Sequence, residues 1–430
     1  MKKIIFAFLI LTTTSCFGIT ETKKISLEQA ILSALSTNPQ MKMAILDVEK
    51  SKNDIKTADK LQNPTVGTFQ NMGRAGEGDP HQIGVEYIVE LLKRGKRKEV
   101  AKTKSQSMYD NQKFQEYNLV FEVKKAYFDL LLKKSNLKIL AEQKNISKEI
   151  LDSTIKQEQK GKVPKTDVVQ AKIAYNRTVM YYNIANSEVI SSRNRFNSVM
   201  NTSNIEYDTQ EEYLNGQFEE LLTLKPTENF LNFENIKNYT LSNRYDLLSA
   251  QEEVKSAQSK LKVAKSQLIP DIELIGGYSY FTKGVSDNGR FQSGAFAGVN
   301  LVNIPLVYRY KPEINNAKLD IQKAQLKYED LQIDVTRSIS DAWEKYTVAK
   351  DNLNFYNTEL LANSKELLQA SIQSLDKKEI DMTDFLVSKK LYLEMMLSYH
   401  VALSEYYTSY AELLKEMNVH NINEMNKETI

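Results

Sequence analysis

The 430-residue chain is poor in residues that interrupt regular secondary structure, with 15 glycines and 8 prolines, each about half of its usual share or less. Its single cysteine excludes an intramolecular disulfide, and its histidines, His81, His400 and His420, are too few and too dispersed for a histidine-rich metal centre. The 57 basic residues nearly balance the 55 acidic ones, so a net charge of +2 gives no general attraction to nucleic acid. These shortages disfavour a disulfide-stabilised scaffold and a loop-rich all-β enzyme.

Motifs of catalysis and cofactor binding are missing too. The sequence has no Ser-His-Asp or Cys-His arrangement in a supporting context, no phosphate-binding P-loop and no cluster of metal-ligating residues. We therefore expect neither an enzyme nor a bound cofactor or metal.

The first residues have the form of a secretory signal peptide over 1–18. Two lysines precede an apolar run at 4–11, and small or polar residues follow it. Cleavage after Gly18 would leave a mature chain outside the cytoplasm. The alternative is a lipoprotein anchored through Cys16, although Thr13 stands where a lipobox carries Leu. Past this segment no run of about 18 apolar residues occurs, so the sequence predicts no transmembrane helix.

The glycines divide the chain into two kinds of segment. Twelve of the fifteen lie in the windows 64–95 and 270–305, whereas 98–160 and 313–430 contain neither glycine nor proline. The last segment has apolar side chains every seven residues, a spacing typical of long helices packed against one another, at Ile339, Tyr346, Leu353, Leu360 and Leu367. A helix of this kind would be roughly 95 to 100 Å long at 1.5 Å per residue.

The two glycine windows alternate between apolar and polar residues with the period of a β-strand. Each has a turn-rich middle, so we predict two hairpins, over 64–92 and 270–305. Acidic side chains occupy one face and would line a wet interior, namely Glu86, Glu90, Asp271 and Glu273. Aromatic residues of the second hairpin are candidates for a membrane-interface girdle, namely Tyr278, Tyr280, Phe281, Phe291 and Phe296. The alternative is an ordinary half-exposed sheet.

The same order of elements occurs twice, which is the strongest feature of the sequence. Aligning Pro64 with Pro270 brings Asn38-Pro39 onto Arg244-Tyr245 and matches the segments that follow. The predicted organisation is a signal peptide at 1–18; a first repeat at 19–200 (helix, hairpin 64–92, long helix 97–160, return helix 164–200); a linker or equatorial segment at 201–230; a second repeat at 231–418 (helix, hairpin 270–305, long helix 313–377, return helix 381–418); and a tail at 419–430.

Local signals support these boundaries. Ser26 with Gln29 forms a capping box that opens the first helix, and Asn38-Pro39 combines a cap with a first-turn proline that restarts it. Gly161 can end the first long helix in the left-handed conformation, and Pro164 suits the start of the return helix.

Two hairpins supply four strands, too few to close a membrane barrel, since the smallest have about eight. Several copies of the chain must therefore share one barrel, because lipid tolerates no open sheet edge. Two copies would give a filled barrel, and three would begin to leave an aqueous lumen. The alternative of another class is a secreted or periplasmic coiled-coil protein, structural or adhesive, that has no pore.

Across nearly the whole mature chain the sequence resembles the TolC family of outer-membrane efflux proteins. The resemblance rests on Leu27-Glu28-Gln29-Ala30 with Asn38-Pro39, on the two hairpin prolines, on 161–167 with Gln170-Ala171, and on 380–386. The segment 90–98, with Lys93-Arg94-Gly95-Lys96-Arg97, is similar to the hairpin exit of the CzcC-like heavy-metal efflux branch.

The resemblance implies a mainly α fold with a small β part. It implies two tandem repeats of long antiparallel helices that form an α-barrel, and four strands that contribute to a trimeric 12-stranded transmembrane β-barrel. Such a homotrimer is a passive exit duct of a tripartite efflux or type I secretion system, embedded in outer-membrane lipid and extending into the periplasm. Its expected partners are a periplasmic adaptor (membrane fusion) protein and an inner-membrane pump of RND or ABC type.

The resemblance also implies site residues at the periplasmic tips. Acids near the second tip would ring the closed aperture at Asp384, with Asp381 beside it and Asp167 in the same place of the first repeat. A ring of carboxylates in a narrow pore can act as a cation filter and gate. The tips themselves would contain Gly161, Pro164 and Lys378. This chain departs from the family at Val387, where a second acid is expected, and at Lys378, where glycine is usual. The alternative is that Asp384 and Asp381 only cap a helix.

Overall fold

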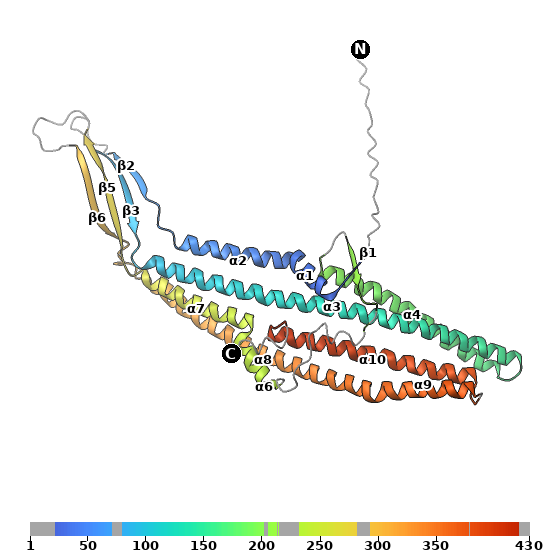
Figure 1. The fold of residues 1–430 in the computed structure, drawn as a ribbon. Helices are drawn as coiled ribbons and strands as arrows, with labels where there is room; N and C mark the ends of the chain where they lie inside the picture. The colour runs from blue at the N-terminus through green and yellow to red at the C-terminus, as the bar shows by residue number, and fades with distance from the viewer. Residues whose placement is uncertain are drawn as a thin grey trace, which may run out of the picture.

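The computed structural model describes residues 22–70, 80–201, 205–212, 214, 232–281, 293–377 and 379–420. The expected signal peptide with Cys16, the residue Lys378 and the last ten residues lie outside this part. The described chain is a long rod of nearly parallel helices that carries a β-sheet at one end (Figure 1). In this part of the chain, no helix is both long enough and apolar enough to cross a membrane.

The same series of elements occurs twice along the chain. The first series is α1 (Leu27–Thr37), α2 (Pro39–Ala58), β2 (Thr65–Gln70), β3 (Pro80–Val89), α3 (Lys93–Gln159) and α4 (Lys165–Val199). The second is α6 (Phe233–Asn243), α7 (Tyr245–Ser266), β5 (Asp271–Phe281), β6 (Gly294–Val302), α8 (Lys311–Phe355), the π turn η2 (Tyr356–Leu360), α9 (Leu361–Asp376) and α10 (Met382–Met417).

Predicted local signals define several of these ends. Ser26 and Gln29 form the capping box of α1, and the Asn38 side chain accepts hydrogen bonds from the first turn of α2, which begins at Pro39. Gly161 has a φ of +71°, the left-handed conformation predicted for the end of the first long helix.

The four long strands form one antiparallel sheet in the order β2-β3-β5-β6. The two hairpins therefore meet through β3 and β5, and β2 and β6 are the edge strands. Two shorter strands, β1 (Thr22–Ile25) and β4 (Glu206–Thr209), pair in parallel near the middle of the rod. The region 201–230, predicted to be a linker or equatorial segment, thus includes a strand that pairs with the start of the described chain.

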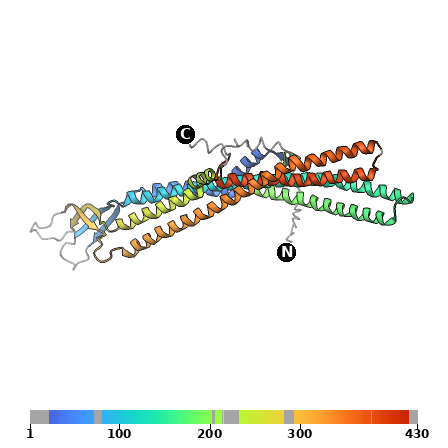
Figure 2. The same cartoon turned by 90° about the horizontal axis from the view of Figure 1, so that it is seen from below.

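The helix α3 runs along most of the rod and packs against α2, α4, α7 and α10 (Figures 1 and 2). An aromatic core lies in its central region, where Tyr127 contacts Phe196 edge-on at 5.6 Å and Phe128 stacks on Tyr407 at 5.4 Å. All four rings are fully buried. Large aromatics gain most from burial at such helix contacts, so this cluster holds the two repeats together.

The second long helix differs from the predicted pattern of apolar side chains every seven residues from Ile339 to Leu367. Buried residues follow the seven-residue spacing to Leu353, but after the π turn the next buried positions are Ser364 and Ser371. Leu367, predicted to lie on the buried stripe, is 43% exposed. The step of eleven residues from Leu353 to Ser364 is a heptad plus four, a stutter that locally changes the winding of packed helices.

Candidate channel wall and gate

The strand register gives the sheet two chemically different faces. One face, here called the apolar face, carries side chains between 43% and 70% exposed, including Val66, Ile83, Val85, Leu274, Tyr278, Val299 and Leu301. The other, here called the acidic face, carries Glu86, Glu273, Gln82, Ser279 and Asn300, together with Gly84, Gly277, Phe296 and the apolar Ile88 and Ile275. An apolar face that no other part of the described chain covers suits contact with lipid, and the acidic face suits water.

The predicted wall residues lie in three different settings. Glu86 and Glu273 are half-buried on the acidic face, and Glu273 accepts a hydrogen bond from the Asn300 amide at 3.0 Å. Glu90 follows the last residue of β3 and pairs with Arg97, and it also accepts a hydrogen bond from Gln62 at 3.0 Å.

Asp271 is buried at the base of the sheet. Its carboxylate lies 2.7 Å from the Lys93 ammonium group, with only 5% and 6% of the two side chains exposed. The Asn303 amide donates to the same carboxylate oxygen at 3.0 Å. The contact joins the first residue of α3 to the first residue of β5 and to the segment after β6. We therefore assign Asp271 a structural role at the junction of sheet and helices.

The basic start of α3 is held by acids from other elements. Asp59, the residue after α2, accepts from Lys98 at 2.7 Å and from Arg94 at 3.0 Å, and these contacts, that of Lys98 foremost, hold its pKa below the usual value. Basic residues are unfavourable at a helix N-terminus, so these pairs permit α3 to begin at Lys93, four residues before the predicted start at 97. The sequence does not reveal the pairs, because the acids come from separate elements.

The sheet register corrects the prediction for Phe296. It lies opposite Gly277 on the acidic face, whereas Tyr278 lies opposite Ala295 on the apolar face. Phe296 therefore cannot belong to the same girdle as Tyr278. Phe291 lies outside the described residues.

The predicted tip residues that the structure describes lie at the turn between α3 and α4 and at the start of α10, and these ends of the helices are at the end of the rod away from the sheet (Figure 1). Gly161 makes the turn between α3 and α4, Pro164 directly precedes α4, and Asp167 lies in the first turn of α4. In the second tip the Asp381 side chain accepts a hydrogen bond from the backbone N–H of Asp384 at 2.9 Å.

Asp381 thus caps α10, whereas the exposed Asp384 carboxylate does not serve as that cap. The two acids, which the sequence could not separate, have different local roles. Within the described ranges, no three histidine, cysteine or acidic side chains gather as a metal site would require.

A further group of polar contacts lies beside the short strands β1 and β4. The hydroxyl of Tyr127 donates to the backbone oxygen of Ile25 at 3.0 Å and also bonds to the Glu211 carboxylate. Burial is the main cause that raises the pKa of Tyr127 far above its usual value. Lys134 pairs with Asp208 at 3.1 Å. These contacts attach both short strands to α3, and no local motif in the sequence predicts them.

The overall form, with a strand sheet at one end of paired helical repeats, is that of outer-membrane channels in solved structures. The Campylobacter jejuni CmeC outer membrane channel is 16% identical, with 100% of this chain and 96% of that chain covered and a TM-score of 0.70. The Vibrio cholerae outer membrane protein VceC is 14% identical (91% and 96% covered, TM-score 0.69), and the open state of the Neisseria gonorrhoeae MtrE channel is 15% identical (92% and 89% covered, TM-score 0.63). At these identities the likeness concerns the fold.

The family itself follows from the sequence match. The model of the outer membrane efflux protein family matches residues 30–202 and 238–412, one stretch in each repeat. The chain belongs to this family. No curated protein sequence matches it. Because it belongs to this family, the protein is an outer-membrane exit duct of a tripartite efflux system, and it extends from the outer membrane into the periplasm. The family consists of channels, and a coiled-coil protein without a pore is not favoured.

Proposed function

We propose that three copies of this chain form one continuous duct, with a shared twelve-stranded barrel in the membrane and a helical tube across the periplasm. The observation that carries the proposal is the sheet order β2-β3-β5-β6, in which the edges β2 and β6 have no partner strand in the described part of the chain. A membrane-embedded edge would leave backbone groups without hydrogen bonds. Pairing β6 of one copy with β2 of the next removes both edges.

Apolar side chains on the outer surface of the helices support the same assembly. On α8, Leu319, Leu326 and Ile333 recur every seven residues and are 60%, 65% and 59% exposed. On α4, Ile173 and Met180 have the same spacing and are 62% and 51% exposed. A seven-residue apolar stripe is the contact pattern of one long helix on another, so we infer that a neighbouring copy covers these stripes.

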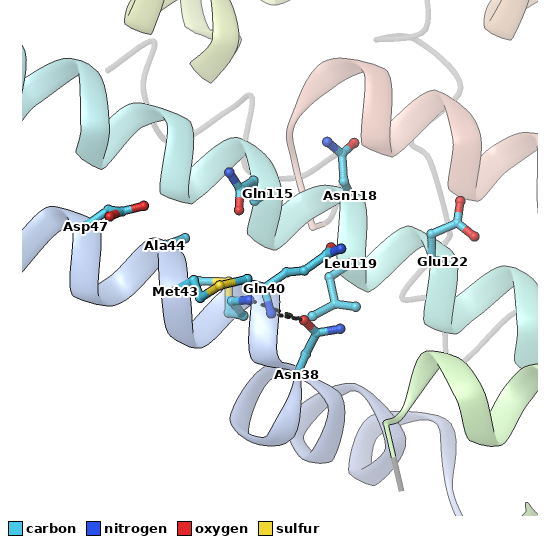
Figure 3. A pocket seen from close by; sticks show the side chains of 10 residues that line it. Asn38, Gln40, Met43, Ala44, Asp47, Gln115, Asn118, Leu119 and Glu122 are labelled. Carbon is cyan, nitrogen blue, oxygen red and sulfur yellow. Dashed lines mark hydrogen bonds between the residues drawn. The ribbon is translucent and has the colours of Figure 1, made fainter.

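A groove of about 530 Å³ lies where α1 bends into α2 (Figure 3). Side chains of α2 such as Met43 and Ala44 form one wall, and Leu119 and Glu122 of α3 form another. Met43 is 56% exposed. The mixture of apolar and polar groups suits a side chain from the neighbouring copy.

The helical tips are the proposed docking end. They lie at the end of the rod opposite the sheet, where a periplasmic adaptor protein and an inner-membrane pump of RND or ABC type would meet the duct. Apolar side chains are exposed at both tips, at Val169 in the first repeat and at Met382 and Val387 in the second. We infer that they contact the adaptor.

We further propose that Asp384 forms the gate, with Asp167 as its counterpart in the first repeat. In a trimer the exposed Asp384 carboxylates would form a ring of three. Such a ring attracts cations and resists simultaneous ionisation. Asp381 contributes by fixing the start of α10 through its cap.

Cysteine pairs across the sheet edges test the assembly. Val66→Cys in β2 would be combined in turn with cysteines at Ala295, Ala297, Val299 and Leu301 in β6, all on the apolar face. One register should give oxidation products of two and three chains, because each edge meets the opposite edge of another copy. The single variants are the controls, since symmetry keeps identical residues apart. If every pair stays monomeric under oxidation, the shared barrel is wrong.

A further inference from the structure

A line of small residues crosses the acidic face of the sheet at one level. The register places Gly67 of β2 opposite Gly84 of β3, Gly84 opposite Gly277 of β5, and Gly277 opposite Phe296 of β6. Three strands thus contribute no side chain at this level, and the fourth contributes a large one.

The Phe296 ring leans across the sheet over these glycines. A Cβ atom added to Gly277 would lie 2.7 Å from the tip of the ring (Cζ), and one added to Gly84 would lie 3.4 Å from the same atom. Gly84 is two strands away from Phe296, so the ring extends over β5 toward β3. A ring that stood upright from β6 could not approach Gly84 in this way.

The two glycines differ in how much room they leave. At Gly277 a Cβ would also lie 2.3 Å from the backbone oxygen of Ile83, so no larger residue fits without displacing backbone. At Gly84 the nearest backbone atom would be the oxygen of Gly276 at 3.3 Å. Gly84 can therefore accept a methyl group in ordinary contact with the end of the ring, after a small shift of that oxygen. A larger, branched side chain at Gly84 would displace the end of the ring, because a side-chain tip moves more easily than paired backbone.

We propose that Phe296 sets the width of the channel at this level, and that Gly84 and Gly277 keep the channel wide by letting the ring lie along the wall. The inference rests on the proposed function, in which the acidic face points into the lumen. A ring lifted from the wall in each of three copies would project toward the axis and narrow the passage for large cargo. Replacing one of these glycines with a larger residue, rather than replacing Phe296 itself, would therefore narrow the channel.

Access from outside the cell tests this width. Asn300 is on the same face and four residues nearer the helices than Phe296, about 13 Å further along the strand. Large reagents entering from the loop end must pass Phe296 to reach it. In intact cells, Asn300→Cys would be labelled with a small maleimide and with polyethylene-glycol maleimides too large for general porins. Labelling of Cys16 is subtracted with the chain that lacks Asn300→Cys.

Gly84→Val, whose branched methyl groups extend beyond the Cβ position into the space of the ring, should slow labelling of Asn300→Cys by the large reagents several-fold and leave the small reagent unaffected. Phe296→Ala should speed labelling by the large reagents. In the Phe296→Ala background, Gly84→Val should have no further effect, because no ring remains to be lifted. Gly298→Val is the matched control: it adds the same side chain to the same face, where no atom lies within 4 Å of the new Cβ, and should change nothing.

Two results would overturn the inference alone: equal slowing by Gly84→Val with and without the ring, or unchanged labelling by the large reagents in Phe296→Ala. The second result does not depend on how well Gly84→Val folds. A different result would overturn the proposed function as well. If the small reagent modifies Val299→Cys on the apolar face but not Asn300→Cys, the acidic face does not line the lumen.

Discussion

Replacing Lys93 with methionine should strongly destabilise the protein. The substitution keeps an apolar stem of similar length but leaves the Asp271 carboxylate without its charge partner, 2.7 Å away in the native contact. Water cannot hydrate the Asp271 carboxylate well in place of Lys93, because only 5% of the Asp271 side chain is exposed. Its second carboxylate oxygen has no hydrogen-bond partner in the described part of the chain. Without Lys93, the hydrogen bond from the Asn303 amide would be the contact that remains among the described residues to stabilise the negative charge.

The magnitude follows from burial. Removing one partner of a buried ion pair costs about 3–5 kcal/mol, whereas an exposed pair contributes about 0–1 kcal/mol. Lys262 and Glu99 provide the matched control: they are 2.9 Å apart, and their side chains are 56% and 45% exposed. Lys262→Met should therefore be nearly silent. The two lysine substitutions should differ by roughly two orders of magnitude or more in the unfolding equilibrium constant.

Denaturant titration of the purified protein in detergent, followed by circular dichroism, measures the difference. The double variant Lys93→Met with Asp271→Leu should recover most of the loss, because an apolar pair can replace a buried ion pair at little cost. The reasoning is refuted if Lys93→Met is no more destabilised than Lys262→Met, or if the double variant is the weakest of the three.

Three further predictions concern the helical part. Asp384→Ala should raise single-channel conductance in planar bilayers and weaken block by divalent cations at unchanged stability, whereas Asp381→Ala should lower stability by about 0.5–2 kcal/mol through the lost cap; unchanged conductance and block in Asp384→Ala would remove the gate. Burial opposes ionisation of Glu416, but Arg244 and the adjacent lysine outweigh it and hold its pKa below the usual 4.5, so stability present above pH 4.5 is lost on acidification. Glu416→Gln should flatten that loss in titrations from neutral to acid pH, and an unaltered acid limb would contradict the assignment. Gly161→Ala should lower the free energy of unfolding by roughly 1–2 kcal/mol, because a φ of +71° is unfavourable for a residue that has a Cβ atom. A melting temperature at or above that of the wild type would contradict this expectation.

Features fixed by neighbouring residues could be predicted from the sequence. The capping box at Ser26, the restart at Asn38-Pro39 and the left-handed Gly161 each depend on a few consecutive residues, and the structure confirms all three. The mainly helical fold with two tandem repeats was predictable for a related reason. Twelve of the fifteen glycines lie in the strand windows, so the helices have few places to end.

Features that depend on distant pairings could not be predicted. Phe296 was assigned to the wrong face because its orientation follows from the register between β5 and β6, which lie on either side of a turn-rich segment. Lys93 and Asp271 are 178 positions apart in the chain, and no local pattern connects them. The stutter after Leu353 was missed because a seven-residue spacing, once recognised, was extended through a π turn that changes it.

The mass of the detergent-extracted particle tests the central claim most directly. Light scattering coupled to size-exclusion chromatography, with the detergent contribution subtracted, should give three chains per particle over a wide range of protein concentration, because each sheet is closed only by its neighbours. A folded particle containing one chain at every concentration would contradict the shared barrel, and with it the duct.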